Sequence, residues 1–376
     1  MKTCSNSRWR VMRPASLGRT VGALVCSAAI LAGSVSSSLA CTRAVYVGEN
    51  GLVLTGRTMD WMEDMSSNIW ALPAGMKRDG AAGPNSVTWT SKYGSVAVAA
   101  YEVGTADGIN EKGLVANLLY LTSADFGQPA KGKPEMSVAV WAQYVLDNYA
   151  TVNEAVAALE KEPFRILAPK LPNGKASTLH LSISDATGDS AIFEYVGGKL
   201  KIHHDKKYTV MTNEPPFDEQ LAINKYWKEV GGTTFIPGTT TGADRFVRAS
   251  FLLSSVPKKV DPAYIKGVPD QSYEVQAVAS LMGVMRSVSV PLGISTPDRP
   301  NLSSTIWRTV SDQTNPRLYF DSATRADTFW VSLSKLDLKP GAPARRLTLQ
   351  NGELYAGETA DKFEKHEMFK FLPATE

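Results

Sequence analysis

Apolar and polar residues alternate over several short stretches beyond residue 40, and this period of two is typical of β-strands with one buried face. Cys41–Val47 alternates in this way and stops at the turn residues 49–51, and Leu52–Met59 follows as the expected hairpin partner. Three further strands are predicted in the first third of the chain: Ser86–Thr90, Ser95–Tyr101 and Leu114–Leu121. Asp107-Gly108 and Asn110-Glu-Lys-Gly113 are expected to form the turn between the last two of these strands.

Helical spacing of apolar residues appears later in the chain. Met136–Asn148 has this spacing, and Thr151-x-x-Glu154 is a capping box that opens a second helix through Glu160. Three more helices are predicted at Asp218–Val230, Ala243–Ser254 and Tyr273–Met285. The remaining periodic segments are predicted strands: His180–Asp185, Ala191–Tyr195, Lys199–His203, Tyr208–Thr212, Thr305–Ser311, Arg317–Phe320 and Phe329–Leu333.

The order of these elements predicts the fold class. Strands and helices come in groups rather than in strict alternation, which favours antiparallel sheets with helices packed outside. The sequence therefore indicates an α+β fold, and a layered α-β-β-α sandwich fits the grouping. No linker, repeat or low-complexity segment interrupts residues 41–376, so we expect a single domain there.

The first 40 residues have the pattern of a secretory signal peptide. They hold five basic residues and no acidic one, and an apolar run at Val21–Val35 leads to a Ser-rich exit. Ser38 and Ala40 are small residues placed as a signal peptidase requires, so we expect removal of residues 1–40. The apolar run is too short to span a bilayer core of roughly 30 Å, and no stable membrane anchor is predicted.

Loss of this segment changes the charge balance. The whole chain has a formal net charge of +3, and loss of the five leader cations leaves −2. A near-neutral chain without a basic block gives no reason to expect binding of nucleic acid. The basic isoelectric point of the whole sequence is therefore largely an effect of the leader.

Cysteine usage singles out one residue. Cys4 and Cys26 leave with the leader, so Cys41 is the one cysteine of the remaining chain and its first residue. A lone thiol in an exported protein indicates reactivity or intermolecular pairing. At the new terminus Cys41 carries a free α-amine with an ordinary pKa of roughly 8, and this amine can accept the thiol proton. Cys41 is thus the candidate nucleophile, with its own amine as the base.

Histidine and metal chemistry are not expected. Four histidines remain after the leader, and no papain-type signature surrounds Cys41. We interpret these histidines as solvated or packed imidazoles: His180, His203, His204 and His366. Clusters of Cys and His with metal-ligand spacing are missing from the sequence, so neither a metal nor another cofactor is predicted.

Five short motifs resemble the choloylglycine hydrolase family, which comprises penicillin V acylases and bile salt hydrolases with an N-terminal nucleophile. They run in the family's order from Cys41 to about Phe320: Cys41 with Arg57-Thr-Met-Asp60, Asn110-Glu-Lys-Gly-Leu114, Met211-Thr-Asn213-Glu-Pro-Pro-Phe217, Arg245-Phe-Val-Arg248 after Pro237-Gly238, and Thr305-Ile-Trp307. Each match alone is weak, whereas five in order behind a cleavable leader form a specific pattern. The resemblance implies hydrolysis of a linear amide C–N bond through an acyl-enzyme.

The resemblance also implies roles for individual residues. Cys41 attacks the amide carbonyl, Asp60 orients the α-amine, and Arg57 and Arg245 favour the thiolate through their charge. Asn213 donates its side-chain N–H to the oxyanion, a contribution of roughly 3–4 kcal/mol in other acyl-transfer enzymes. The backbone N–H of Tyr120 is implied as the second donor.

Each of these residues has a plainer interpretation. Arg57 and Asp60 could form a surface ion pair worth under about 1 kcal/mol. Asn213 could be a turn residue, and Asp244-Arg245 could cap a helix. Arg248 is expected to be a solvated partner on that helix.

The residue types around the nucleophile bear on the substrate. In the family, bile salt hydrolases typically carry Asn at the position of Tyr120 and penicillin V acylases carry Tyr, so the resemblance favours an acylase for aromatic or fatty acyl groups. Trp61 and Met62 could line the apolar acyl pocket, although Trp61 could equally be ordinary core. A bile salt or an N-acyl-homoserine lactone is the alternative substrate of the same mechanism.

Three further expectations concern the state of the protein in the cell. Many family members lack a leader, so a leader here indicates export, most simply to a Gram-negative periplasm. Lipidation at Cys41 would instead give a tethered binding protein without enzymatic activity, but Ser38 stands where a lipoprotein signal usually has Leu. Family members often form homotetramers, and the resemblance implies the same here.

Overall fold

The hairpin that begins at Cys41 forms as the alternating pattern predicts. In the computed structural model, which describes residues 41–128, 132–295 and 303–374, β1 (Thr42–Val47) pairs antiparallel with β2 (Val53–Trp61). A 3-10 turn at Glu49–Gly51 joins the two strands. Arg43 lies directly opposite Arg57 in the register, so these two side chains project from the same face of the sheet.

This hairpin lies inside one of two large sheets. Within the described residues the first sheet has seven strands in the order β14-β1-β2-β15-β16-β17-β19. The bounds of its other strands are β14 Val210–Thr212, β15 Ser304–Asp312, β16 Arg317–Ser322, β17 Thr328–Ser332 and β19 Gly357–Glu358. Strands distant in sequence, β2 and β15, are neighbours at its centre. The first strand and the C-terminal third of the chain therefore build one sheet.

The second sheet has nine strands over the described ranges, in the order β13-β12-β11-β8-β7-β6-β3-β18-β20. Their bounds are β13 Lys199–His204, β12 Ser190–Val196, β11 Leu179–Ser184, β8 Val115–Tyr120, β7 Gly104–Asn110, β6 Ser95–Ala100, β3 Ile69–Leu72, β18 Arg345–Leu347 and β20 Glu364–Lys365. Two small ladders accompany it: β4 Lys77–Asp79 with β5 Thr88–Thr90, and β9 Glu135–Ser137 with β10 Arg165–Leu167.

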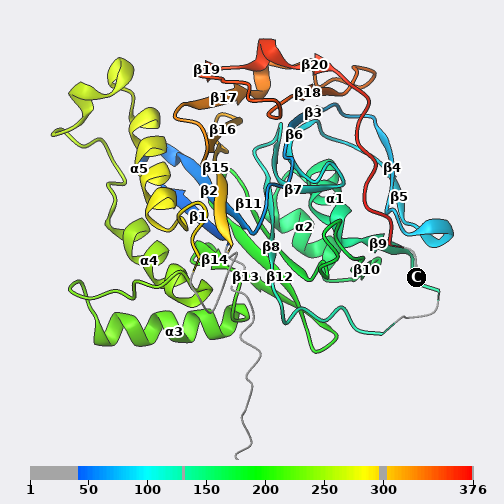
Figure 1. The fold of residues 1–376 in the computed structure, drawn as a ribbon, viewed down its shortest axis with the longest axis horizontal. Coiled ribbons are helices and arrows are strands. Elements are labelled where there is room, and N and C mark those ends of the chain that lie inside the picture. Colours follow the sequence, from blue (N-terminus) through cyan, green and yellow to red (C-terminus); the bar gives the residue numbers. More distant parts are fainter. Residues whose placement is uncertain (1–40, 129–131, 296–302, 375–376) are drawn as a thin grey trace, which may run out of the picture. The chain divides into compact units, whose positions relative to one another are not determined.

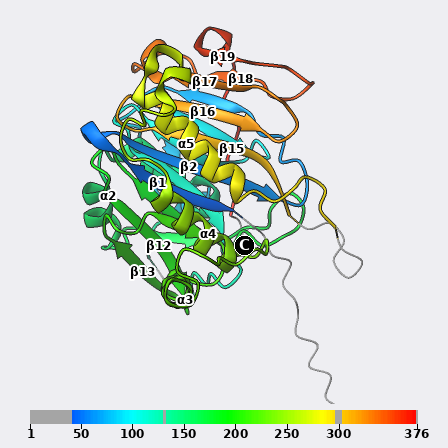
Figure 2. The ribbon, with the colours of Figure 1, turned by 90° about the vertical axis from the view of Figure 1, so that its left-hand side faces the viewer.

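Helices cover the outer faces of both sheets. The helices are α1 Trp141–Asn148, α2 Val152–Leu159, α3 Phe217–Val230, α4 Gly242–Ser255 and α5 Tyr273–Ser287. Figure 1 shows α3, α4 and α5 beside the first sheet and α1 and α2 beside the second, and Figure 2 shows α5 and α4 lying in front of β1 and β2. The predicted four-layer α-β-β-α sandwich of the α+β class is confirmed.

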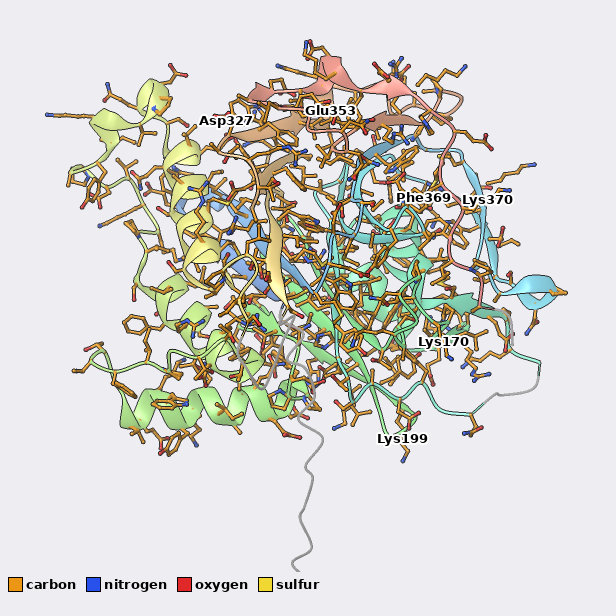
Figure 3. All side chains as sticks on the ribbon, viewed as in Figure 1. Lys170, Lys199, Asp327, Glu353, Phe369 and Lys370 are labelled. Carbon is orange, nitrogen blue, oxygen red and sulfur yellow. The ribbon has the colours of Figure 1, made fainter. Side chains whose placement is uncertain are left out.

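Short 3-10 turns complete the regular structure at Gly83–Asn85, Val138–Val140, Ile265–Gly267, Pro269–Gln271, Leu333–Lys335 and Ala360–Lys362. Figure 3 shows side chains filling the space between the layers, while the labelled Lys170, Lys199, Asp327 and Lys370 lie exposed at the periphery. Within the residues that the structure describes, no helix combines the length and apolarity that crossing a membrane requires.

Two predicted elements are wrong. Residues 107–110 belong to strand β7 rather than to a turn, because Asp107 is buried and bonded to neighbouring strands. The first helix begins at Trp141 rather than at Met136, because Glu135–Ser137 pairs with β10 and Ser137 accepts a hydrogen bond from Ala139 N at the start of a 3-10 turn.

The turn after β7 explains the motif Asn110-Glu-Lys-Gly113-Leu114. The Asn110 side chain accepts hydrogen bonds from the backbone of Lys112 and Leu114, at 3.0 and 3.1 Å. Gly113 has a φ of +79°, and a Cβ there would come within 2.2 Å of the Gln313 carbonyl oxygen. The motif therefore shapes a tight turn against the other sheet, and Gly is required at its last position.

Candidate active site

Cys41 lies directly before the first strand, at the point where the two sheets approach each other. Its side chain is buried, and its sulfur lies 3.8 Å from both Met59 Sδ and the backbone oxygen of Asp60 on β2. Its backbone nitrogen, a peptide nitrogen while Ala40 is attached, donates a hydrogen bond to Asn213 Oδ1. The strand pairing therefore fixes the position of the nitrogen that a cut before Cys41 would free as an α-amine.

Arg245 and Asp60 are a buried cation and anion next to Cys41. Arg245 comes from α4, is fully buried, and donates through Nη1 to the Cys41 carbonyl oxygen at 2.7 Å and to Thr42 Oγ1 at 2.5 Å. The same Nη1 lies 3.7 Å from Asp60 Oδ2. Asp60 comes from the end of β2 and is likewise buried. A cation and an anion thus enclose the residue at which the sequence predicts the chemistry.

Asn213 and Tyr120, the two implied oxyanion donors, are neighbours. Asn213 Nδ2 donates to the Tyr120 carbonyl oxygen at 2.6 Å, and Asn213 Oδ1 also accepts from Arg245 Nη2 at 3.3 Å. Leu121 N donates to Thr178 O across the β8–β11 ladder, so the backbone N–H and C=O of Tyr120 both face away from β11. The second hydrogen of Asn213 Nδ2 and the Tyr120 N–H are therefore the donors from which an oxyanion site can be built.

The Arg57 side chain bonds to both β7 and β8 where these two strands no longer pair with each other. The ladder of these strands ends at Asp107 and Asn117, and beyond it Arg57 donates to Ala106 O and Leu118 O, both at 2.7 Å. Its guanidinium also lies 5.0 Å from the centre of the Trp307 ring. Arg57 makes no hydrogen bond to the sulfur in the described structure, so it acts on the thiol through its charge.

The electrostatic environment of Cys41 is mixed. Burial raises the pKa of the thiol, the positive charges of Arg57 and Arg245 oppose this, and Asp60 adds to the increase. Burial likewise raises the pKa of Asp60 to about 6, although Arg245 and the hydroxyls of Thr305 and Thr58 counteract it. A thiol in this environment remains protonated at neutral pH, and its reaction with a carbonyl requires a nearby base.

An apolar cavity of about 70 Å³ opens at Cys41. Its walls are almost wholly apolar and include Trp61, Met65, Leu118, Tyr120, Leu171 and Leu179. The rings of Trp61 and Tyr120 lie 5.7 Å apart between centroids. Met62 lines a larger neighbouring cavity of about 550 Å³, which shares Trp61 as a wall. Of the two predicted substrate-binding residues, only Trp61 lies in the cavity that contains Cys41.

Two hydroxyl groups beside Asp60 were not predicted from the sequence. Thr305 Oγ1 donates to Asp60 Oδ1 at 2.5 Å, and Thr58 Oγ1 donates to Asp60 Oδ2 at 3.2 Å. A register shift between Thr305 and Trp307 in β15 places Thr305 opposite Asp60. Thr305 belongs to the motif Thr305-Ile-Trp307, and its place in that motif was the one sign in the sequence that it could be a site residue.

A third missed residue, Tyr101, lies at the mouth of the cavity. Its hydroxyl accepts hydrogen bonds from Trp61 Nε1 at 2.6 Å and Asn173 Nδ2 at 3.2 Å, and donates to Glu63 Oε1 at 2.5 Å. Tyr101 and Glu102 form the β6–β7 turn with φ values of +54° and +52°. Backbone in this region is costly for residues other than Gly and concentrates at functional sites. The turn therefore holds Trp61 in place from the outside of the cavity.

The plainer interpretations of the site residues do not describe this arrangement. Arg57 and Asp60 are both buried rather than paired at the surface. Thr241 is the residue that caps α4 through its side chain, and Arg245 points into the site. Arg248 instead donates to the carbonyl oxygens of Pro237 and Thr239 outside the cluster.

The histidines form no part of the cluster around Cys41. His180 and His203 both contact Glu194, at 2.9 and 3.4 Å, and Glu194 accepts from the backbone nitrogen of Phe217 at 3.0 Å. Burial alone would raise the pKa of Glu194, but the bonds from His180, His203 and Phe217 outweigh it and hold the pKa at about 2. In the described ranges 41–128, 132–295 and 303–374, no three His, Cys, Asp or Glu side chains gather as metal ligands would.

This geometry is suited to acyl transfer. A thiol and the nitrogen that cleavage would free lie on one residue, the Asn213 side chain contacts both that nitrogen and Tyr120, and an apolar cavity ends at the sulfur. The buried cations can stabilise a thiolate, and the donors can stabilise a tetrahedral oxyanion.

Comparison with known proteins agrees with this chemistry. The profile of the linear amide C–N hydrolases, choloylglycine hydrolase family, matches residues 41–345. A protein of Pectobacterium atrosepticum described as penicillin V acylase is 44% identical over 370 residues, covering 94% of this chain and 98% of the relative. A bile salt hydrolase/transferase of Clostridium perfringens is 30% identical over 249 residues, covering 58% of this chain and 73% of the relative.

A solved structure shares the fold as well. The structure of penicillin V acylase from Agrobacterium tumefaciens superposes with a TM-score of 0.79 at 50% identity, covering 88% of this chain and 99% of that chain. The match with the family profile spans most of the chain and starts at the residue on which the site is built. This chain belongs to the choloylglycine hydrolase family of linear amide C–N hydrolases and is a hydrolase of linear amide bonds.

Proposed function

We propose that the chain, once cut before Cys41, is a penicillin V acylase that cleaves penicillin V into phenoxyacetate and the β-lactam nucleus. The observation that carries this proposal is the aromatic wall of the cavity at Cys41. Trp61 and Tyr120, whose ring centroids lie 5.7 Å apart, and Tyr101 line this cavity together with aliphatic side chains, a surface suited to an aromatic acyl group. The relatives named penicillin V acylase support the same substrate.

The first half of the proposed reaction forms an acyl-enzyme. The α-amine of Cys41 takes the thiol proton, and the sulfur attacks the amide carbonyl carbon, whose π electrons move to the oxygen. Asn213 Nδ2 and the Tyr120 N–H donate to that oxyanion, which removal of one donor would destabilise by about 3–4 kcal/mol. The C–N bond then breaks as the α-ammonium protonates the leaving nitrogen, and a thioester on Cys41 remains.

The second half releases the acid. The free α-amine removes a proton from water, and the hydroxide oxygen attacks the thioester carbonyl at the same oxyanion site. Collapse of this intermediate expels the sulfur, which regains the proton from the α-ammonium. Arg245 keeps the terminal residue in place through both halves by its hydrogen bond to the Cys41 carbonyl oxygen, and Asp60, 3.7 Å from the same Arg245 nitrogen, would orient the freed α-amine.

The two cavities suggest how the substrate is divided. The cavity at Cys41, about 70 Å³, accommodates part of a ligand, whereas typical ligand pockets measure roughly 300–1,000 Å³. The neighbouring cavity of about 550 Å³ is lined by more polar groups and shares Trp61. We place the acyl group in the first cavity and the amine side of the substrate in the second.

A panel of N-acyl substrates tests the substrate assignment. We expect kcat/KM for penicillin V to exceed that for glycine- and taurine-conjugated bile salts by at least tenfold on protein whose first residue is confirmed as Cys41. Turnover of a bile conjugate well above penicillin V would overturn the acylase assignment and favour the activity named for the Clostridium perfringens relative. Cleavage of an N-acyl-homoserine lactone above both would favour the third substrate class.

Export and maturation are part of the proposal. We propose that residues 1–40 are a signal peptide removed on export to the periplasm, and the start of the family match at residue 41 supports this boundary. Intact mass and fractionation of the native protein test it. A mature mass that begins at Cys41 in the periplasmic fraction is expected, whereas a diacylglyceryl mass on Cys41 would establish the lipoprotein.

A homotetramer is proposed for the assembled enzyme. Large apolar side chains are exposed on α3 and the segments after it, at 58% for Tyr226, 62% for Val230, 61% for Phe235 and 72% for Tyr264. Exposed apolar side chains of this size favour contact between copies. Light scattering after gel filtration is expected to give four chains per particle, and a monomer across the micromolar range would contradict the assembly.

A further inference from the structure

Gln220 on α3 is a buried polar side chain that the proposed reaction does not use. Within α3, all of which the structure describes, Phe217 and Gln220 are the two buried residues, and Gln220 has no solvent exposure. A buried amide costs free energy unless its oxygen and its N–H groups find hydrogen-bond partners. The partners of Gln220 therefore bear on its role.

These partners all lie on the segment that carries Asn213. Gln220 Oε1 accepts a hydrogen bond from the backbone nitrogen of Thr212 at 3.1 Å, and Nε2 donates to the Thr212 carbonyl oxygen, also at 3.1 Å. Nε2 donates in addition to the carbonyl oxygen of Pro215 at 2.6 Å. One side-chain amide thus bonds to the backbone on both sides of Asn213, directly before it and two residues after it.

A purely structural role is the plainer interpretation of these bonds. Within the described residues β14, which ends at Thr212, is an edge strand of the first sheet. An antiparallel edge strand leaves the N–H and C=O groups of alternate residues without a strand partner. Gln220 bonds to both backbone groups of Thr212, as a further strand would, so it completes the edge of the sheet.

Two other contacts connect the same segment to elements of the site. Thr212 Oγ1 donates to the carbonyl oxygen of Gly242, the first residue of α4, at 2.8 Å. The Glu214 side chain accepts a hydrogen bond from the backbone nitrogen of Thr122, just beyond the end of β8. A shift of this segment would therefore move Asn213 relative to both α4 and β8.

We propose that Gln220 is a positioning residue for the amide hydrolysis, because it fixes residues 212–215 so that Asn213 Nδ2 can donate to the oxyanion. Gln220 lines neither the cavity at Cys41 nor its larger neighbour, so it acts through Asn213 alone. An oxyanion donor works only when it is preorganised, and a misplacement of about 1 Å can cost about 10²-fold in rate. This inference rests on the role proposed above for Asn213.

An aldehyde and an alcohol with the same phenoxy group separate the oxyanion contact from acyl binding. With phenoxyacetaldehyde, the Cys41 sulfur bonds to the carbonyl carbon, the π electrons move to the oxygen, and the thiol proton passes to the α-amine. The resulting hemithioacetal has its oxygen at the oxyanion site, whereas 2-phenoxyethanol forms no such adduct. We define the aldehyde preference as the ratio of the Ki of the alcohol to the Ki of the aldehyde, both measured against penicillin V on the cut enzyme.

Two substitutions of Gln220 should lower this preference to different extents. In Gln220→Met, which removes all the bonds, it is expected to fall about tenfold, because Asn213 is no longer held in place. Gln220→Glu keeps the shape of the side chain and the acceptor for Thr212 N, so a fall of about threefold is expected; this variant carries the test if Gln220→Met does not fold. The Ki of 2-phenoxyethanol should stay the same in both variants.

Gln276 on α5 offers a matched control. It is also a buried helix glutamine that bonds to backbone, since it accepts from Asp261 N at 2.9 Å and donates to Lys259 O at 3.1 Å. Gln276→Met is expected to lower the free energy of unfolding in urea, as Gln220→Met does, but to leave the aldehyde preference unchanged. An equal fall of the preference in Gln276→Met would overturn the inference.

Asn213→Ala distinguishes this inference from the mechanism on which it rests. Its aldehyde preference is expected to fall about 10²-fold, because a donor to the oxyanion is lost. If it falls in Asn213→Ala but stays at the wild-type value in the folded Gln220 variants, the positioning role is wrong and the role of Asn213 stands. An unchanged preference in Asn213→Ala would overturn both.

Discussion

The pKa values of two buried carboxylates, Asp60 and Glu194, are shifted in opposite directions by the folded protein. Both are almost fully shielded from solvent, with exposures of 0% and 1%. Burial raises the pKa of Asp60 to about 6, whereas the bonds to Glu194 outweigh burial and lower its pKa to about 2. Burial is therefore common to the two sites, and the hydrogen-bonding partners make the difference.

The partners explain the contrast. Glu194 receives hydrogen bonds from His180 and from the backbone nitrogen of Phe217, with His203 as a further contact at 3.4 Å. Asp60 has two threonine hydroxyls and an arginine nitrogen at 3.7 Å, too far for a strong hydrogen bond. Glu194, whose oxygens accept several hydrogen bonds, therefore stabilises the fold. The pKa of Asp60, which has no cation within hydrogen-bonding distance among the described residues, can still be lowered by a positive charge placed beside it.

The proposed cleavage before Cys41 would supply that charge. While Ala40 is attached, the nitrogen of Cys41 is an uncharged amide that donates to Asn213. The freed α-ammonium would be a cation in the same cluster, and an opposite charge nearby lowers the pKa of a carboxylic acid. We therefore treat Asp60 as a residue of the reaction and Glu194 as a residue of the framework.

The largest expected effect is that of Asp60→Asn on catalysis. We expect kcat/KM to fall about 10³-fold, because the amine loses the anion that orients it and general-base catalysis contributes about 10²–10⁴-fold. Steady-state kinetics on the cut enzyme measure this. A loss below tenfold would remove Asp60 from the mechanism and reduce it to a buried polar residue.

Glu194→Gln is the matched change at the other carboxylate. We expect the free energy of unfolding in urea to fall by about 3 kcal/mol, because the buried carboxylate that accepts from His180 and from the Phe217 backbone nitrogen is lost and an unsatisfied buried group costs roughly 1–3 kcal/mol. The kcat of the folded fraction should stay within tenfold of the wild type. A wild-type unfolding free energy together with a hundredfold loss of kcat would reverse the roles of the two residues.

The pH dependence of stability should have opposite slopes for the two groups. Glu194 has a lower pKa in the folded chain than its ordinary 4.5, so its contribution of about 3 kcal/mol is present above pH 4.5 and lost as pH falls towards 2. Asp60 has a raised pKa, so with an uncleaved extension before Cys41 the unfolded chain ionises first and stability falls as pH rises from about 4 to 6.

Urea unfolding between pH 2 and 7 measures both slopes. We expect Glu194→Gln to flatten the range from pH 2 to 4.5, and Asp60→Asn to flatten the range from 4 to 6 in the extended chain. The cut chain should lose the second slope without any substitution, because its α-ammonium lowers the pKa of Asp60. Equal slopes in the cut and extended chains would contradict this coupling.

The smallest expected effect comes from Thr305→Val. The Thr305 hydroxyl donates to Asp60 and lowers its pKa, so its loss should reduce kcat/KM about tenfold and move the acidic limb of the pH–rate profile upward. Thr309→Val is the matched control, because Thr309 lies on the same strand and donates to Asp107 at 2.5 Å. Identical pH profiles for the two variants would mean that Thr305 acts only through packing.

Local pattern was sufficient for much of the fold. Alternation identified β1 and β2, and the capping box at Thr151 identified α2, because these elements follow from short-range chemistry. Strand β7 was not predicted, because Asp107, Gly108 and Asn110 favour turns when only local sequence is considered. In the structure Asp107 is held by Thr309 and Asn117 on other strands, and tertiary contacts override the local preference.

The site was predictable to the extent that its residues have a recognisable motif. Cys41, Arg57, Asp60, Asn213 and Arg245 lie together in the structure as the resemblance implies, from β1, β2, the end of β14 and α4. Thr58 and Thr305 lie within noted motifs, but the motifs do not indicate which of their residues bond to Asp60. The position of Thr305 depends on the register shift in β15 and that of Tyr101 on a turn with positive φ, and neither feature follows from local sequence.

The most direct test of the account captures the acyl-enzyme itself. Mature protein is quenched with acid during turnover of penicillin V and digested with pepsin below pH 3, where the protonated α-amine cannot take the acyl group from the sulfur, and the N-terminal peptide is examined by mass spectrometry. We predict a peptide that begins at Cys41, with a free α-amine and one phenoxyacetyl group on the sulfur. A chain that starts at another residue, a modified α-amine, or an acyl group on a different side chain would contradict it.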